Sequence, residues 1–167
     1  LKPAETTPLT ALLFAELCEE VGLPKGDFNL VTGDGTTGSE LVNHEGISKI
    51  AFTGSTSVGK YIQNAVGERD IGLTLELGGK AANIVYNDAA LDQAVEGVVN
   101  GIFFNQGHVC CAGSRLLLQE DIHDEFIDKL EKRMQTLRVG NPLDKNTDIG
   151  AINSKEQLDK ITSLVNE

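Results

Sequence analysis

Residues 47–66 read ISKIAFTGSTSVGKYIQNAV and contain the clearest change of pattern in the chain. The β-branched and aromatic run at 47–52 predicts a strand, and residues 57–66 predict a helix that follows a TGST turn. Ser55 or Thr56 is suited to cap that helix at its N-terminus. A strand, a tight turn and a helix in this order are typical of a βαβ unit, which has a parallel sheet.

The same alternation extends to both sides of this unit. We expect further helices at about 8–21, 37–43, 92–104 and 122–137, and strands at 28–31, 73–77, 83–86 and 115–119. Strands that alternate with helices predict βαβ units on a parallel sheet, so the fold class is α/β. Gly78-Gly79 is the expected boundary between two domains, 1–78 and 79–167. Because Leu1 is not methionine and a helical pattern still runs at Glu167, we expect an internal segment of a longer protein.

Charge and cysteine content narrow the class of protein. The formal charge is −11, whereas phosphate binding calls for clustered Lys and Arg, so we expect no nucleic-acid partner. No apolar run approaches the ~20 residues of a membrane span, and no leader pattern is visible, which favours a cytoplasmic protein without a membrane partner. The three cysteines are odd in number and two are adjacent, which argues against disulfides. No ligand spacing indicates a metal site.

Two glycine-rich turns could hold a phosphate. Residues 33–38 (GDGTTG) match G-x-G-x-x-G, but the acid expected about 20 residues later for a ribose is missing. Residues 52–59 (FTGSTSVG) form the better cradle, because N–H groups at a helix N-terminus attract a pyrophosphate, Gly54 permits its close approach and Ser55 can donate to it. An ordinary strand-to-helix turn stays open as the alternative at both places.

Cysteine and glutamate candidates for chemistry lie further along the chain. Residues 105–115 (NQGHVCCAGSR) crowd polar, glycine and thiol residues together. A thiol is reactive as the thiolate, and a glycine-flanked loop that enters a helix would favour that form; a buried, inert cysteine is the alternative. Glu76 lies in an apolar strand, where a carboxylate takes up a proton more readily and suits a general base; the alternative is the solvent side of an edge strand. His108 is too near Cys110 in sequence to be well aimed at it.

Both regions resemble signatures of the aldehyde dehydrogenase superfamily. Residues 76–80 (ELGGK) resemble its glutamate signature, and residues 104–115 (FNQGHVCCAGSR) resemble its cysteine signature. The resemblance extends over essentially the whole chain. It implies part of a Rossmann-like NAD-binding domain at 1–78, followed by part of an α/β catalytic domain at 79–167.

The resemblance also implies roles for individual residues. Cys110 matches the nucleophile and Glu76 the general base. The positions that match cofactor contacts are Lys2, Glu5, Gly35, Gly54, Ser55, Thr56, Gly59 and Leu77. The positions that match the substrate pocket are Phe104, Val109 and Cys111. No residue matches a metal ligand.

The implied activity is the oxidation of an aldehyde to its carboxylic acid with NAD. The Cys110 thiolate forms a thiohemiacetal and then a thioester, which water activated by Glu76 hydrolyses. Glu5 at the ribose favours NAD over NADP, and the aldehyde itself is not specified. The full-length protein is expected to form a homodimer or homotetramer. Because the family's oxyanion asparagine, a second glutamate and the oligomerisation strand fall outside residues 1–167, the isolated chain is expected to be inactive.

Three alternatives remain. The first is a CoA-acylating aldehyde dehydrogenase, although such relatives generally lack the glutamate that Glu76 matches. The second is a non-catalytic structural or binding protein of the same fold, against which the presence of both Cys110 and Glu76 argues. The third is a redox-sensing pair of Cys110 and Cys111, against which stands the strain that a disulfide between neighbours imposes on the backbone.

Overall fold

The computed structural model describes residues 1–167, which form two compact units, Leu1–Glu76 and Leu77–Glu167. Each unit contains a two-stranded sheet with helices. The α/β fold class and the parallel strands expected from the sequence are therefore confirmed. That the two units belong to a cofactor domain and a catalytic domain stays a prediction.

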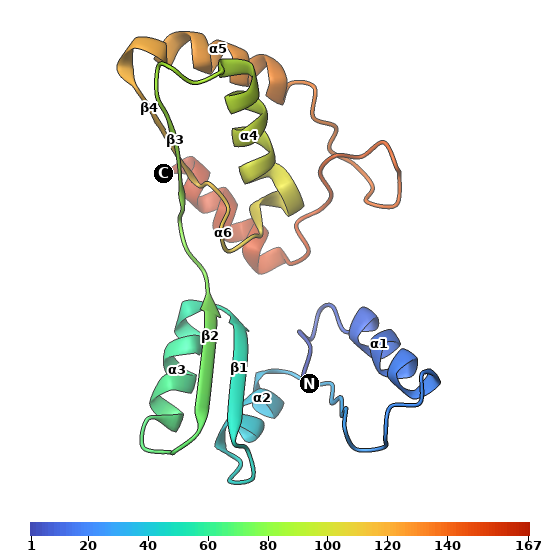
Figure 1. Ribbon diagram of the computed structural model, residues 1–167. Coiled ribbons are helices and arrows are strands. Elements are labelled where there is room, and N and C mark those ends of the chain that lie inside the picture. The colour runs from blue at the N-terminus through green and yellow to red at the C-terminus, as the bar shows by residue number, and fades with distance from the viewer. The chain divides into compact units, whose positions relative to one another are not determined.

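The first unit contains the βαβ element expected from residues 47–66. Strand β1 (Lys49–Gly54), helix α3 (Thr56–Val66) and strand β2 (Gly72–Leu77) follow one another, and β1 and β2 run side by side in the same direction with α3 on one face (Figure 1). The core of the unit is formed where apolar residues of α3 and both strands meet; it consists of Val42, Ile62 and Val66, with Ile50, Phe52, Ala65, Ile71, Leu73 and Leu75 packed around them. Burial of this face fixes the sheet against the helix.

Helix α2 (Gly35–Asn43) packs on α3 and is held there by polar contacts. Ser39 Oγ and Tyr61 OH lie 2.6 Å apart, and Asn43 Nδ2 donates to Tyr61 OH at 3.1 Å. These bonds lower the pKa of Tyr61. At the C-terminal end of α2, the guanidinium of Arg69 donates to the carbonyl oxygens of Val42, His44 and Ile47. Arg69 thus satisfies carbonyls that the end of a helix leaves without partners.

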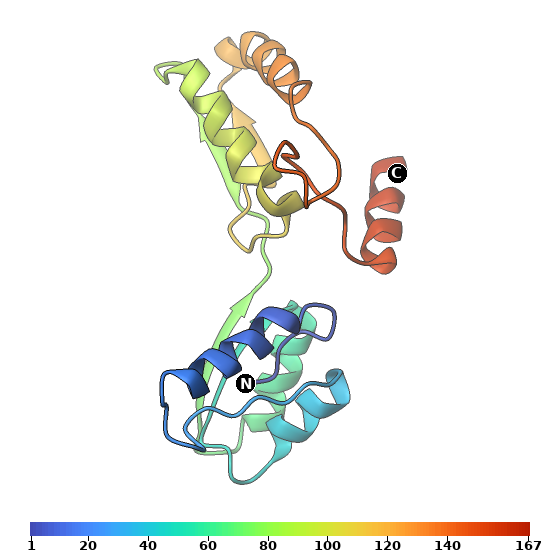
Figure 2. The same cartoon turned by 90° about the vertical axis from the view of Figure 1, so that its right-hand side faces the viewer.

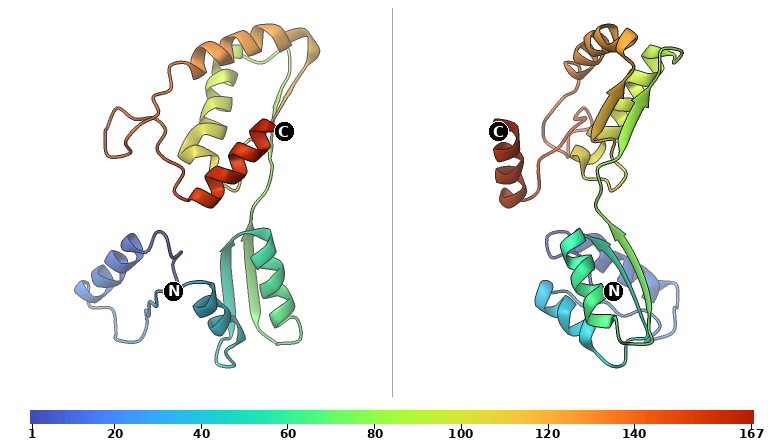
Figure 3. Two further views of the ribbon diagram at one scale, coloured as in Figure 1. Left: turned by 180° about the vertical axis from the view of Figure 1, so that it is seen from behind. Right: turned by 90° about the vertical axis from the view of Figure 1, so that its left-hand side faces the viewer.

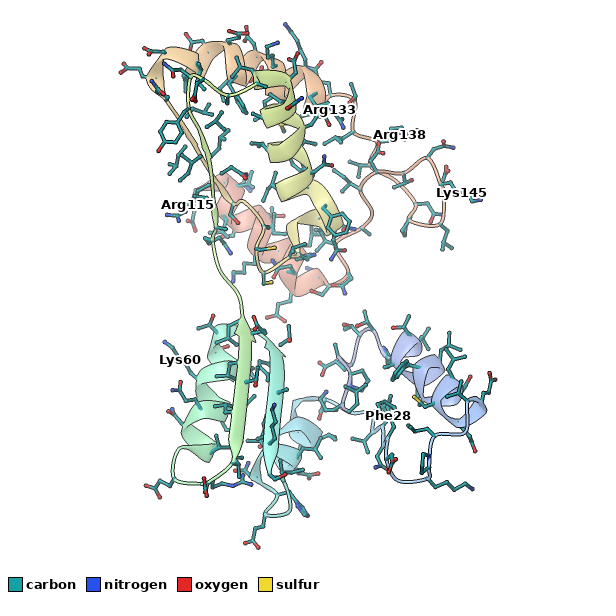
Figure 4. The ribbon with its side chains drawn as sticks, viewed as in Figure 1. Phe28, Lys60, Arg115, Arg133, Arg138 and Lys145 are labelled. Carbon is teal, nitrogen blue, oxygen red and sulfur yellow. The ribbon has the colours of Figure 1, made fainter.

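The strand expected at residues 28–31 is not found. Phe28 turns toward α1 (Leu9–Glu20) and packs edge-on against Phe14, with ring centroids 5.3 Å apart (Figure 4). The backbone bonds only to the first residue of the chain: the Val31 N–H donates to the Leu1 carbonyl at 3.0 Å and the Leu1 amino group donates to the Asn29 carbonyl at 2.6 Å. Two such bonds make no ladder, so the segment stays irregular.

The second unit is built on a second βαβ element. Strand β3 (Ala82–Val85) pairs in parallel with β4 (Arg115–Leu118), in a register that joins Ala82 to Arg115 and Val85 to Leu118. Helix α4 (Leu91–Phe103) connects them and α5 (His123–Met134) follows. Both helices share one core with the strands, made of Val85, Val95, Val98, Val99, Ile122 and Phe126. The helices and strands expected in this half are therefore confirmed, with ends that agree to within three residues.

Shorter elements complete the second unit. The 3₁₀ turns η1 (Phe104–Gly107) and η2 (Glu120–Ile122) follow α4 and β4, and α6 (Lys155–Asn166) ends the chain. Figures 2 and 3 show α6 standing apart from α4 and α5, and none of its residues is buried. None of the helices combines the length and the apolar character that a membrane crossing requires.

Candidate active site

The cysteine signature lies in a loop between α4 and β4. It begins at η1, where Asn105, Gln106 and Gly107 have φ angles of 49°, 57° and 74°. Positive φ values are uncommon outside glycine, and two successive ones on non-glycine residues turn the chain sharply away from the axis of α4. The loop thereby leaves the helix and returns along the unit toward β4.

Hydrogen bonds fix the start of this loop. The His108 N–H donates to the Asn105 carbonyl at 2.9 Å, and Asn105 Nδ2 donates back to the His108 carbonyl at 3.2 Å. Gln106 Nε2 donates to the Ala151 carbonyl at 3.2 Å, from a segment distant in sequence. These side-chain bonds to the backbone hold the two left-handed residues in place.

The end of the loop is fixed more tightly. The Gly113 N–H donates to the Gly101 carbonyl at 3.0 Å, and Asn83 Nδ2 donates to the Gly113 carbonyl at 3.1 Å. A side-chain carbon on Gly113 would lie only 2.0 Å from Asn83 Nδ2, so any other residue here would displace the Asn83 amide. Sequence reasoning missed the role of Asn83, although a lone amide in the apolar run from Ala82 to Val85 was a visible signal.

Between these fixed ends lies a turn with both thiols at its centre. The Ala112 N–H donates to the Val109 carbonyl at 3.0 Å, and Ala112 is buried at 4% exposure. Cys110 and Cys111 are both exposed, while Val109 is half-buried. Cys110 is therefore not buried within residues 1–167, and its reactivity stays a prediction. No helix begins directly after the loop; residues 115–118 form the expected strand, β4, which pairs with β3.

The end of the glutamate signature lies against the same loop. A side-chain carbon on Gly79 would lie 3.5 Å from the Cys110 carbonyl oxygen. The Arg115 Nε donates to the Lys80 carbonyl at 3.1 Å, and its backbone N–H donates to the Ala81 carbonyl. Within the second unit, residues 79–81 therefore touch both ends of the segment from Cys110 to Arg115. Two motifs that are separate in the sequence are adjacent in the structure.

Glu76 lies near the end of β2 and its side chain is exposed. Strand alternation turns Leu73 and Leu75 toward the core and Glu76 to the opposite face of the sheet. The apolar surroundings expected for Glu76 are therefore absent, because its apolar neighbours in sequence point the other way. Leu77 ends the strand and is half-buried. Phe104, expected in the substrate pocket, is 71% exposed at the end of α4.

The two glycine-rich turns differ in the residue that caps the N-terminus of the helix after each turn. Asp34 caps α2 and accepts from the Thr36 N–H at 2.8 Å, a bond that lowers the pKa of Asp34. Neutral Ser55 caps α3 and accepts from the Val58 N–H at 3.3 Å. A carboxylate already satisfies the positive end of α2, whereas α3 has no anion at its N-terminus. The turn at 53–59 thus precedes the one of these two helices whose N-terminus has no carboxylate cap.

Other candidate cofactor residues surround these turns in the first unit. Lys2 Nζ donates to the Gly33 carbonyl at 2.9 Å, which brings Lys2 to the turn at 33–38. A side-chain carbon added at Gly35 would have no heavy atom within 4 Å. The side chain of Glu5 is exposed. At Gly54 such a carbon would lie 2.5 Å from the ring of Phe52, so packing within the chain already requires glycine there. Thr56 is exposed at the start of α3, and Gly59 is buried within it.

The whole chain, residues 1–167, matches the model of the family described as "Aldehyde dehydrogenase family". The chain belongs to this family. No group of three or more His, Cys, Asp or Glu residues lies close enough together to hold a metal ion.

Similar aldehyde dehydrogenases come from several bacteria. The curated Bacillus subtilis (strain 168) protein DhaS, which carries an aldehyde dehydrogenase name, is 48% identical over 166 residues, which are 99% of this chain and 34% of DhaS. A solved NAD-dependent aldehyde dehydrogenase from Sinorhizobium meliloti is 40% identical, with a TM-score of 0.97 over 99% of this chain and 33% of that one. A betaine aldehyde dehydrogenase double mutant from Staphylococcus aureus, solved in complex with NAD⁺, is also 40% identical, with a TM-score of 0.94 over the same shares. The chain thus spans about a third of the length of these relatives.

Proposed function

We propose that the full-length protein oxidises an aldehyde to its carboxylic acid with NAD, with Cys110 as nucleophile and Glu76 as general base. The observation that carries the proposal is the contact between the two signatures: Gly79 lies against the Cys110 backbone, and Lys80 accepts from Arg115. An exposed thiol on a loop fixed at both ends meets the need of a nucleophile for access and for a constant position.

The first unit has features that suit a dinucleotide. The N-terminus of α3 carries no anion, and its first N–H groups, on Thr56 and Ser57, have no partner within the chain. Ser55 Oγ accepts from the Val58 N–H and lies 3.0 Å from Ser57 Oγ, so this pair of hydroxyls stands at the start of the helix and can donate to a phosphate. Gly54 to Gly59 would hold the pyrophosphate, and Lys2 and Glu5 the adenosine ribose. Bound NAD⁺ supplies the acceptor for the hydride that leaves the substrate carbon.

Cys110 would carry out the bond-forming step. Its thiolate sulfur adds to the aldehyde carbon, and the carbonyl oxygen becomes an oxyanion. The N–H groups of Cys110 and Cys111 make no hydrogen bond within the chain and are free to stabilise that charge. Loss of the hydride from the same carbon leaves a thioester on Cys110. Phe104, Val109 and Cys111, which lie on the same loop, would line the substrate pocket.

Glu76 would act in the second half of the reaction. Its exposed carboxylate takes a proton from a water molecule, whose oxygen attacks the thioester carbon. The thiolate of Cys110 leaves and the acid is released. Exposure of the carboxylate to water is compatible with this role, because its partner in the reaction is water itself.

Substitution of the nucleophile tests the first step. Cys110→Ser should abolish the aldehyde-dependent formation of NADH by the full-length protein, because a serine hydroxyl at this place has no base aimed at it. Cys18→Ser, on the half-buried face of α1, is the matched control and should retain activity. If Cys110→Ser kept the activity of the control, Cys110 would not be the nucleophile.

Substitution of the base tests the second step. Glu76→Gln should lower the rate of steady-state turnover by about 10²–10⁴-fold, the usual contribution of a general base. One equivalent of NADH should still form rapidly, since thioester formation does not need Glu76. Glu19→Gln on α1 replaces another exposed carboxylate and should change neither phase. Equal loss of the initial NADH formation and of the steady-state turnover would assign Glu76 to an earlier step. Stimulation of the turnover by coenzyme A would favour acyl transfer to a thiol.

The cofactor preference depends on Glu5. A carboxylate at the ribose hydroxyls would repel a 2′-phosphate, so we expect the full-length protein to prefer NAD over NADP. Glu5→Gln should reduce that preference, as judged from kcat/KM for the two cofactors. A native preference for NADP would contradict the assignment of Glu5.

A further inference from the structure

Asn83 is a half-buried polar residue of β3 to which the proposed reaction gives no role. Its amide lies close to two glycines from different parts of the second unit. A side-chain carbon added at Gly101 of α4 would lie 3.6 Å from Asn83 Oδ1, and one added at Gly113 of the cysteine loop would collide with Nδ2. The Asn83 amide therefore fills the place where β3, α4 and the cysteine loop meet.

Both backbone groups of Gly113 are bonded at this junction. Its N–H donates to the Gly101 carbonyl at 3.0 Å, and its carbonyl accepts from Asn83 Nδ2 at 3.1 Å and has no other hydrogen-bond partner. Glycine has more backbone freedom than any other residue. The loop thus has its most flexible residue at the junction, and the bond from Asn83 restrains that residue.

A short series of contacts connects Gly113 to the proposed nucleophile. Ala112, the residue before Gly113, is buried, and its N–H donates to the Val109 carbonyl at 3.0 Å. That bond closes the turn that contains Cys110 and Cys111. The thiol and the two N–H groups assigned above to the oxyanion therefore belong to one turn, whose C-terminal end is held through Gly113.

We propose that Asn83 is a positioning residue, whose amide holds the Gly113 carbonyl and thereby keeps the Cys110 turn aligned for attack on the aldehyde. The inference rests on the proposed function, because it needs Cys110 as the nucleophile. In this role Asn83 needs no contact with substrate or NAD, so it affects the rate of the chemical steps and not cofactor binding. A displacement of about 1 Å far from the reacting atoms can cost about 10²-fold in rate.

Asn83→Asp in the full-length protein tests the inference. Aspartate keeps the shape of the side chain, but its carboxylate cannot donate to the Gly113 carbonyl. The rate constant for the first NADH formed after mixing with aldehyde should fall by about 10–10²-fold, with an unchanged amount of NADH per chain in this phase and an unchanged KM for NAD. Asn100→Asp adds the same charge at an exposed position of α4 and should change none of the three quantities.

The size of this first phase separates positioning from folding. A merely structural role would lower the amount of NADH per chain, because fewer molecules are folded, and would leave the rate constant of the remaining molecules as in wild type. That result would overturn the inference. Cys110→Ser separates it from the proposed function: if that variant stays active, the nucleophile itself is wrong. If Cys110→Ser is inactive and Asn83→Asp reacts at the wild-type rate, only the role of Asn83 is wrong.

A second set of variants keeps the test decisive if Asn83→Asp does not fold. Asn83→Ala removes the amide that a methyl group at Gly113 would meet. The double variant Asn83→Ala/Gly113→Ala should therefore unfold at a higher denaturant concentration than Gly113→Ala alone. Its first NADH should still form as slowly as in Asn83→Ala, because the donor is missing in both. Recovery of the rate together with the stability would show that packing alone aligns the loop, against the inference.

Discussion

Gly113 shows how a single residue can constrain the loop that contains Cys110. A methyl group at this residue would collide with the amide of Asn83, which holds the Gly113 carbonyl. We expect Gly113→Ala to lower the free energy of unfolding by about 1–3 kcal/mol, as is usual for overpacking, and to slow alkylation of Cys110. Denaturant titration and thiol labelling measure the two effects.

Gly97 provides the matched control for this prediction. It lies in α4, where an added side-chain carbon would meet nothing. Gly97→Ala should raise the free energy of unfolding by roughly 0.5–1 kcal/mol, because alanine loses less backbone entropy in a helix. A Gly113→Ala protein as stable as the Gly97→Ala protein would show that the loop end adjusts freely.

The roles of Cys110 and Glu76 stay predictions, whereas their surroundings can be compared with what the sequence suggested. Cys110 and Glu76 stand out as residue types within their motifs, but the environment of each depends on contacts that a linear pattern does not contain. Cys110 is exposed in a turn that the Ala112 N–H closes onto the Val109 carbonyl, and Glu76 is exposed because strand alternation puts the leucines on the other face. The role of Asn83 depends on a partner 30 residues away.

The loop from Arg138 to Asp148 is an element whose stability should depend on pH. Arg138 donates to Asp148 through its side chain and its backbone N–H, and Val139 forms a bridge with Ile149. Arg138 lowers the pKa of Asp148 from 3.8 to about 2. A depressed carboxyl pKa stabilises the fold above the unfolded value, and that contribution disappears as pH falls through the folded value.

We therefore expect faster amide exchange at Gly140 and Asp148 as pH falls from about 4 toward about 2, after correction for intrinsic exchange. Asp148→Asn should already show fast exchange at neutral pH, with little further change in acid. Asp144→Asn is a control in the same loop. Unchanged protection of Gly140 in acid would mean that the backbone bonds alone hold the loop.

Elements with strong local signals were predicted well, and those that depend on distant partners were not. Helices α2 and α3 begin where Asp34 and Ser55 can cap them. The segment at 28–31 has the composition of a strand, yet its backbone meets only Leu1 and its aromatic ring packs on α1. Strand propensity needs a partner strand to become a ladder.

Much apolar surface is exposed over the chain as a whole. Helix α1 has no buried residue, and the face of the β3/β4 pair opposite the helices exposes Ile84 and Leu117. Parallel sheets are normally covered on both faces. Because of this exposed apolar surface, we expect the isolated 167-residue chain to bind a hydrophobic dye such as ANS and to self-associate. Because the chain spans only a third of the length of its relatives, we also expect it to oxidise no aldehyde.

Dye fluorescence and sedimentation at several concentrations check this expectation. The full-length protein is the control and should bind little dye, with aldehyde-dependent NADH formation measured on both. A monomeric isolated chain without dye binding would show that these faces need no cover. Aldehyde oxidation by the isolated chain would show that residues 1–167 contain a complete site.

The cysteine loop also bears on how aldehyde dehydrogenases of this kind can diversify. Its ends are held by the backbone contacts of Gly101 and Gly113, whereas the side chains of Val109 and Cys111 contribute no hydrogen bond to that hold. A mutational library at these two positions should therefore yield many folded variants with altered substrate range, whereas one at Gly113 should yield few. Residues 109 and 111 can therefore vary in sequence while the backbone position of Cys110 is retained.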